Sequence, residues 1–134
     1  MIINFKFSKQ NSDKNTLIFC DLNLKINDID DVLIKTEGFG INYADIMARQ
    51  GLYGEAPDLP FVPGYEVVGT VIETGKEAQH LLNKRVVGFT RFGGYATHTI
   101  TKLSAIYEIG LDFNLSDALA LATQYVTAYY ATSY

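Results

Sequence analysis

Three short segments of the chain carry the polar residues that are best suited to chemistry. These residues are Asn42, Asp45, Tyr65, Glu66, Gln124 and Thr127. The amide of Asn42 can donate a hydrogen bond to an oxygen, and Tyr65 offers a hydroxyl donor or a ring that lines a flat pocket. Simpler roles stay open, because Asn42 can cap a helix, Tyr65 can be a core aromatic, and Thr127 can bond to the preceding helical turn.

The cysteine and histidine residues do not point to metal or disulfide chemistry. The single cysteine, Cys20, cannot form an internal disulfide or a cysteine-rich zinc site. Cys20 lies in an apolar run, so we expect it to be a small buried hydrophobe. His80 and His98 stand alone in the sequence, and we expect surface or strand histidines rather than ligands.

The composition is that of an ordinary folded domain. The 134 residues are 48% hydrophobic and 19% charged, with a formal net charge of -4, which suits one buried core. Lysine and arginine form no basic patch, so nucleic acid is not an expected partner. No apolar run approaches the roughly 18 residues of a membrane span, and residues 1–10 lack the apolar core of a signal peptide. We therefore expect a cytoplasmic protein.

Residues 1–115 have the pattern of short strands joined by turns. A short helix is expected over residues 43–50, where Gly51 is placed to end it. Three prolines then make a stiff loop over residues 57–63. Strands are expected at 2–7, 17–24, 32–37, 67–72, 85–89, 95–101 and 105–109. Short strands at this spacing indicate a mainly β fold, a small and partly open barrel.

Residues 116–134 have a different, helical pattern. Ser116 is a good N-cap and Asp117 suits the first turn. Apolar residues then recur on one wide helical stripe, which includes Leu119, Ala122, Tyr125, Val126, Tyr129 and Tyr130. We therefore divide the chain into a barrel, residues 1–115, and a linking helix, residues 116–134. An apolar face this wide tends to find a partner, so we expect a homodimer through the helix.

Three sequence blocks, in this order, resemble the medium-chain dehydrogenase/reductase superfamily. They are G-F-G-I-N-Y-A-D-I-M-A-R-Q-G-L-Y at 38–53, P-F-V-P-G-Y-E-V-V-G-T-V-I-E-T-G at 60–75 and T-A-Y-Y-A at 127–131. The first block is similar to the zinc-free quinone oxidoreductase branch, and within it to the vesicle amine transport protein-like oxidoreductases. The resemblance implies an N-terminal GroES-like domain, a partly open β-barrel whose C-terminal helix leads toward a Rossmann domain that is missing here.

Two positions in these blocks differ from the zinc alcohol dehydrogenases of the same superfamily. Those enzymes carry a cysteine where this chain has Asn42 and a histidine where it has Tyr65, and an amide and a phenol are poor zinc ligands. The resemblance therefore implies an NADPH-dependent oxidoreductase that passes hydride to a small hydrophobic quinone or enone without zinc.

A dinucleotide needs a glycine-rich turn for its pyrophosphate, and G-x-G-x-x-G occurs nowhere in this chain. In the family this motif lies downstream of the third block. We interpret the chain as the N-terminal part of a reductase, truncated or split, and expect it to be inactive alone.

The resemblance also implies roles for the polar residues. Asn42 and Tyr65 would be catalytic, donating to the developing enolate oxygen, with Asn42 also able to reach a cofactor hydroxyl. Thr127 and Gln124 would contact the nicotinamide side of the cofactor. One departure concerns Met47, which stands where many quinone reductases have a tyrosine.

Four further residues would support the site or line it. Asp45 would fix its loop by hydrogen bonds, and Glu66 would bond to backbone or to a basic side chain such as Arg49. Tyr53 and Phe92 would line an aromatic substrate pocket.

Two other functional classes stay open at this point. A binding or interaction module that has lost catalysis fits the vesicle-protein likeness, and a co-chaperonin would share the barrel fold. A G-x-G-x-x-G motif further along the full gene would decide for the reductase.

Overall fold

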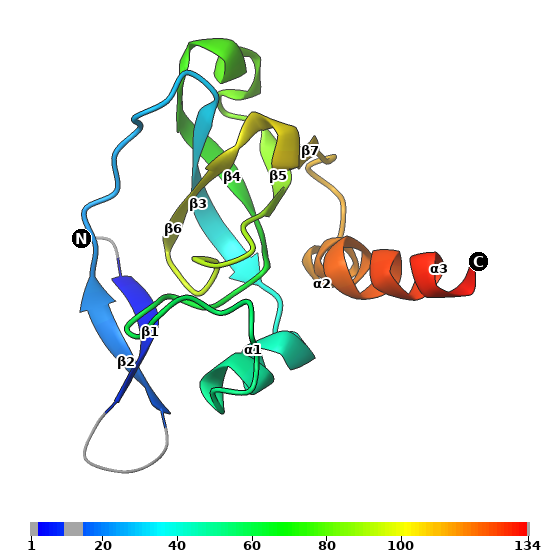
Figure 1. The fold of residues 1–134 in the computed structure, drawn as a ribbon. Coiled ribbons are helices and arrows are strands. Elements are labelled where there is room, and N and C mark those ends of the chain that lie inside the picture. The colour runs from blue at the N-terminus through cyan, green and yellow to red at the C-terminus, as the bar shows by residue number, and fades with distance from the viewer. Residues whose placement is uncertain (1–2, 10–14, 134) are drawn as a thin grey trace.

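A computed structural model describes residues 3–9 and 15–133, and side chains over residues 18–133. Strands β1 (Ile3–Lys9) and β2 (Asn15–Asp21) form an antiparallel hairpin. A five-stranded sheet follows, in which every neighbouring pair is antiparallel. Its spatial order is β6 (His98–Lys102), β3 (Asp31–Phe39), β4 (Glu66–Thr74), β5 (Arg85–Phe89) and β7 (Ile106–Glu108). Figure 1 shows this sheet curled, with the hairpin beside it. The expected mainly β fold with a partly open barrel is confirmed.

Most of β4, the central strand of the sheet, is buried on both faces, and its pleat explains why. Successive side chains of a strand point to opposite faces. Val67 packs inside the curled sheet with Ile34, Val71 and Val86, while Val68 packs outward against the C-terminal helix. Both valines are fully buried. A strand without a polar face is thus the expected result of having a core on each side.

Short helices close the ends of the barrel, and a long one leaves it. These are α1 (Tyr43–Arg49) and the 3₁₀ turns η1 (Lys76–Leu81) and η2 (Leu103–Ala105). The C-terminal helix consists of α2 (Leu115–Leu119), the π-helical turn η3 (Ala120–Tyr125) and α3 (Val126–Thr132). It extends away from the sheet (Figure 1). Ala118 and Ala122 are its buried contacts with the sheet.

The N-cap of the C-terminal helix lies two residues earlier than expected. Asn114, not Ser116, is the N-cap, and its Oδ1 accepts from the backbone N–H groups of Ser116 (2.8 Å) and Asp117 (3.2 Å). Asparagine caps as well as serine does. The position of the first turn, set by how Leu115 and Ala118 pack, decides between the two residues.

Three further expectations change in detail. The strand expected at 95–101 is β6, His98–Lys102, because the preceding residues bond to the proline loop: Tyr95 N–H donates to the Pro63 carbonyl (2.9 Å). The strand expected at 17–24 ends at Asp21. Cys20 is half-buried rather than buried, because in the described part of the chain its hairpin forms a separate two-stranded sheet.

A buried carboxylate ties together the end of the sheet that lies away from α1. Asp31, the first residue of β3, accepts from Lys102 Nζ (2.8 Å) and from the backbone N–H groups of Asn27 (3.0 Å) and Asp28 (2.9 Å). Burial alone would raise the pKa of Asp31, but these donors outweigh it and lower the pKa to about 2. The segment before β3 is thereby fixed to β6.

Candidate functional site

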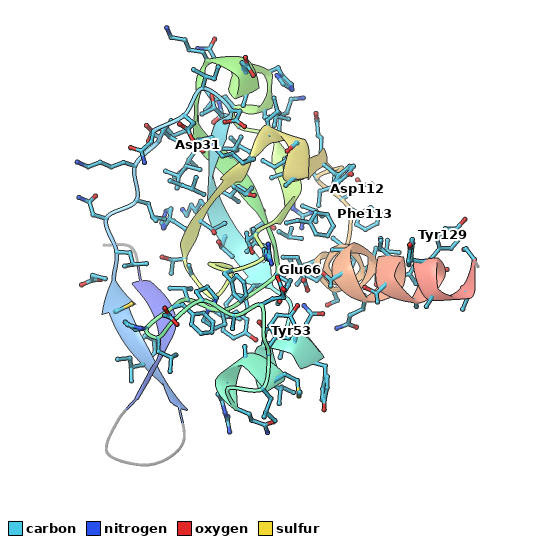
Figure 2. All side chains as sticks on the ribbon, in the orientation of Figure 1. Asp31, Tyr53, Glu66, Asp112, Phe113 and Tyr129 are labelled. Carbon is cyan, nitrogen blue, oxygen red and sulfur yellow. The ribbon has the colours of Figure 1, made fainter. Side chains whose placement is uncertain are left out.

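The polar site lies where three parts of the chain meet: the start of α1, the first residue of β4 and the π-helical turn of the C-terminal helix. Figure 2 shows Glu66 at this junction, with Tyr53 below it and Asp31 toward the opposite end of the sheet. The loop from β3 to α1 brings Asn42 to Glu66, and the packing of Ala122 against the sheet brings Thr123 there.

Glu66 is the centre of the site. Its side chain is fully buried. Asn42 Nδ2 lies 3.0 and 2.8 Å from its two carboxylate oxygens, and Thr123 Oγ1 donates to Oε2 at 2.5 Å. Burial raises the pKa of Glu66, and the nearby Asp45 adds to the rise, while the hydrogen bonds from Thr123 and Asn42 oppose it. Within the described residues this carboxylate has neutral donors and no ion pair.

A glycine makes room for the Glu66 carboxylate. A Cβ on Gly40 would lie 1.7 Å from Glu66 Oε1, so the buried carboxylate would have to move to make room for it. The backbone N–H of Gly40 also lies 3.4 Å from the Glu66 carbonyl oxygen. The loop that precedes Asn42 is therefore shaped around Glu66.

Asp45 holds the loops on either side of the site. It accepts from the backbone N–H groups of Asn42 (2.9 Å) and Gly64 (3.0 Å). The first contact is the return bond of a capping box. Burial raises the pKa of Asp45, although those two bonds and the Tyr95 hydroxyl act to lower it. Gly64 has φ +109°, a conformation that favours glycine.

Four aromatic rings pack beside Glu66. Tyr65 lies edge-to-face with Tyr53 (ring centroids 6.3 Å apart) and is tilted against Phe92 (5.6 Å), which in turn meets Phe61 edge-to-face (5.5 Å). The Tyr65 hydroxyl oxygen is buried and makes no aligned hydrogen bond with any described residue. Burial raises the pKa of Tyr65, and the neighbouring Tyr53 side chain adds to that rise. The Tyr65 hydroxyl therefore stays protonated at neutral pH.

Two cavities flank this region. One of about 410 Å³ lies beside α1 and the proline loop, and Tyr53 and Phe61 are among its lining residues. The other, about 310 Å³, lies between the sheet and the C-terminal helix. Its lining is apolar apart from the Tyr107 hydroxyl and includes Val87, Phe89 and Leu121.

The structure brings together most, but not all, of the residues expected from the sequence. Those in contact around Glu66 and Tyr65 are Asn42, Asp45, Tyr65, Glu66, Tyr53 and Phe92. Thr127 and Gln124 are exposed on the C-terminal helix. The expectation that Arg49 pairs with Glu66 is wrong. Asn42 and Thr123 donate hydrogen bonds to Glu66 instead. Arg49 is exposed, because it lies on the outer side of α1.

Thr123 is the site residue that sequence reasoning missed. It stands four residues before Thr127, so both lie near one face of the helix. The spacing of four residues from Thr127 was the feature of the sequence that could have identified Thr123 as a site residue. The isolated histidines behave as expected: His80 is exposed, and half-buried His98 has its pKa lowered by burial and by Lys35.

Among the described residues, three carboxylates, Asp28, Asp30 and Asp31, are close enough together to hold a metal ion. Lys102 Nζ already lies 2.6 to 3.0 Å from all three, so we assign this group to an ion-pair network. No helix in the described part of the chain has both the length and the apolar character to cross a membrane.

Residues 28–111 match the family model of the alcohol dehydrogenase GroES-like domain. The chain belongs to this family. The match contains Asn42, Asp45, Tyr65 and Glu66, so most of the site lies in the GroES-like domain, while Thr123 lies beyond it.

Relatives of known name place this GroES-like domain in the medium-chain dehydrogenase/reductase superfamily, as the sequence blocks indicated. The chain is 39% identical to "Quinone oxidoreductase-like protein 2" of Bos taurus over 102 residues, which are 75% of this chain and 29% of the relative. It is 33% identical to "Synaptic vesicle membrane protein VAT-1 homolog-like" of Homo sapiens over 97 residues, 72% of this chain and 23% of the relative. The chain thus spans less than a third of the length of these curated relatives.

A solved structure shares the fold over almost the whole chain. The quinone oxidoreductase of Thermus thermophilus, which was also solved in complex with NADPH, aligns with a TM-score of 0.78 and 25% identity. The alignment covers 96% of this chain and 39% of that one. The GroES-like domain described here is accordingly quinone oxidoreductase-like.

Proposed function

We propose that this chain forms the substrate-side domain of an NADPH-dependent oxidoreductase that transfers hydride to a quinone or enone without zinc. The observation that carries the proposal is the buried cluster of Asn42, Glu66 and Thr123 at the junction of the barrel with its C-terminal helix. The names of the relatives, and the NADPH complex of the Thermus enzyme, support the class of reaction.

The residues of this chain suit the nicotinamide end of the cofactor but not its phosphates. Thr127, one helical turn beyond Thr123, and Gln124, the residue next to Thr123, both expose polar side chains. A glycine-rich turn for the pyrophosphate is absent from the sequence. NADPH would supply the hydride when bound. The residues of the chain would orient the nicotinamide ring and exclude water. Tight binding needs a nucleotide-binding domain in addition.

Tyr65 is the proposed donor to the substrate oxygen. Its hydroxyl keeps its proton at neutral pH and has no aligned partner within the described residues. These are the properties needed in a group that donates to an oxygen as negative charge develops. Tyr53 and Phe92 pack against the Tyr65 ring. Tyr53 also lines the cavity of about 410 Å³, which has the size expected for a small hydrophobic substrate, whereas Phe92 lines a separate cavity of about 120 Å³.

A chimaeric enzyme tests the proposed function. Residues 1–134 would replace the matching segment of the bovine quinone oxidoreductase-like protein 2, and NADPH oxidation would be measured with a quinone and with an enone. We expect activity that falls about 100-fold in the Tyr65→Phe chimaera, because its donor is lost. The unaltered bovine protein, assayed in parallel, is the control. A chimaera that binds NADPH but reduces neither acceptor, beside an active control, would contradict the proposal and favour the interaction module.

The chain alone is expected to reduce no quinone with NADPH and to show no measurable heat of NADPH binding by titration calorimetry. Without the phosphate-binding turn, the few contacts at the nicotinamide end are too weak. Micromolar binding to the 134 residues would place the cofactor site elsewhere.

We also predict that the chain binds no zinc. Asn42 Nδ2 is already bonded to Glu66, and a phenol such as Tyr65 is a poor ligand. Elemental analysis of protein purified without a metal-affinity tag is the measurement. Stoichiometric zinc that survives dialysis would contradict this prediction.

A further inference from the structure

The cavity of about 410 Å³ beside α1 has a buried apolar end and an exposed mouth. Its lining residues are Ala48, Gly51, Tyr53, Ala56, Pro57, Asp58, Leu59 and Phe61. Ala48 and Phe61 are buried, whereas Gly51, Pro57 and Asp58 are exposed. A ring compound that enters the cavity would place its apolar part against Ala48 and Phe61, because apolar surface gains by leaving water. A charged substituent would stay at the mouth, since burying a charge is costly.

Asp58 is the one charged residue among the described residues that line this cavity. An aspartate carries a negative charge at neutral pH. Within the described part of the chain, Asp58 forms no ion pair. Arg91 pairs with Glu55 instead, and Arg49 is exposed on the outer side of α1. The mouth of the cavity therefore carries a negative charge that no cation of these residues neutralises by direct contact.

We propose that Asp58 makes the cavity select its ligands by charge, so that uncharged and cationic ring compounds bind and anionic ones are disfavoured. Resting on the proposed function, this narrows the substrate to quinones and enones that carry no carboxylate, sulfonate or phosphate group. Two unit charges about 6 Å apart in water interact strongly enough to change a binding constant about threefold. We expect an effect of this size, because Asp58 is exposed to water.

The second large cavity, between the sheet and the C-terminal helix, offers an internal comparison. The described residues that line it include no charged side chain. A ring compound bound there should therefore be selected by its apolar surface and not by its charge. Leu121 and Val126 line this second cavity, whereas Tyr53 and Phe61 line the first, so the signals of these four residues tell where a compound binds.

Three one-ring probes of similar size test the charge selection on the 134-residue chain without cofactor. They are benzylamine, which is a cation at pH 7, uncharged benzyl alcohol and the benzoate anion. Nuclear magnetic resonance titration at low salt would follow the signals of Tyr53 and Phe61. The dissociation constant of benzylamine should lie about threefold below that of benzyl alcohol, and that of benzoate about threefold above it. Salt at about 1 M should bring the three values together, because it screens exposed charges.

Asp58→Asn should bring the three dissociation constants to within about twofold of one another at low salt. The variant should fold, because the Asp58 side chain is exposed and forms no ion pair within the described residues. Asp112→Asn is the matched control. It removes one negative charge from the loop between β7 and α2, which lies away from α1 (Figures 1 and 2). The charge selection should be unchanged in this control.

Equal affinity for the three probes in the unaltered chain would overturn the proposal, and so would a selection that survives in Asp58→Asn. Shifts confined to Leu121 and Val126, or no shifts with any probe, would also overturn it, because the cavity beside α1 would then not be the ligand site. The chimaera assay of NADPH oxidation uses an uncharged quinone and an uncharged enone. Hydride transfer can therefore be observed even where the charge selection fails, so the two proposals fail separately.

Discussion

At the scale of single residues, two buried carboxylates near opposite ends of the barrel have opposite electrostatics. Asp31 meets the ammonium of Lys102, and its pKa falls to about 2. Burial raises the pKa of Glu66, and the nearby carboxylate of Asp45 adds to the rise, against the opposing effect of its neutral donors. Removing one partner of a buried ion pair is costly, whereas a buried carboxylate with a raised pKa and no ion partner is a candidate for a functional position. The contrast separates the structural end of the molecule from the candidate site.

Asp31→Asn should destabilise the chain in a pH-dependent way. The folded pKa of Asp31 lies below its ordinary 3.8, so its contribution is complete above about pH 4 and is lost as the pH falls toward about 2. We expect a loss of about 1 kcal/mol at pH 7, allowing for solvent around Lys102, and almost none at pH 2. Urea unfolding at both pH values measures this. An equal loss at the two pH values would contradict the ion-pair explanation.

Gly40→Ala should destabilise the chain by about 2 kcal/mol, because its methyl group would overlap Glu66 Oε1. Gly54→Ala is the matched control, since a Cβ there meets nothing within 4 Å. Combining Gly40→Ala with Glu66→Ala should cost less than the sum of the two single changes, because the overlap is gone. Thermal unfolding of the four variants checks this, and additive losses would mean that the two residues do not compete for space.

At the scale of elements, the C-terminal helix is attached through small residues. Ala118 and Ala122 let the helix approach Val68 and Val87 closely. The π-helical turn over Ala120–Tyr125 includes Thr123, the residue that reaches Glu66. Extra residues in a helical turn change which side chains face the sheet, and such turns occur often at functional sites. The start and the winding of this helix together place the hydroxyl of Thr123.

Asn114→Ala should therefore weaken the helix start by about 1 kcal/mol, because Asn114 Oδ1 satisfies two backbone N–H groups. Ser116→Ala should be close to neutral, since Ser116 is not the cap. Urea unfolding gives the loss, and hydrogen exchange over residues 115–123 shows where it acts. A larger effect for Ser116→Ala than for Asn114→Ala would contradict the observed cap.

At the scale of the whole molecule, a curled sheet with a projecting helix leaves apolar surface uncovered. The C-terminal helix exposes four large apolar or aromatic side chains, each between 56% and 67% exposed: Tyr125, Val126, Tyr129 and Tyr130. They lie next to the cavity of about 310 Å³ between the helix and the sheet. Exposed apolar surface gathered in this way favours association. The homodimer expected from the sequence stays a prediction on this basis.

Light scattering of the chain should show a dimer at high concentration, and replacing Tyr129 and Tyr130 with serine should lower the mass to one chain. Tyr43→Ser is the control, because Tyr43 is 74% exposed on α1, away from the helix. Circular dichroism should show the barrel intact in every variant. A wild-type chain that stays monomeric at high concentration would contradict the prediction.

The local parts of this protein could be predicted from the sequence alone. Alternating and continuous apolar runs predicted the strands, since a pleat has a period of two. Gly51 ends α1 with φ +72°, as expected of a glycine placed there. The blocks around Asn42 and Tyr65 predicted the family, because the order of residues within each block is what identifies the family.

Only the tertiary structure decided which polar groups meet. Glu66 lies 24 residues from Asn42 and 57 from Thr123 along the chain, so no local pattern encodes these contacts. They depend on the loop that Gly40 allows, on the start of the C-terminal helix at Asn114 and on its π-helical turn. Ala118 and Ala122 pack with Val68 and Val87 and hold the C-terminal helix against the sheet. This packing brings Thr123 to Glu66, whereas Arg49 lies on the exposed side of α1.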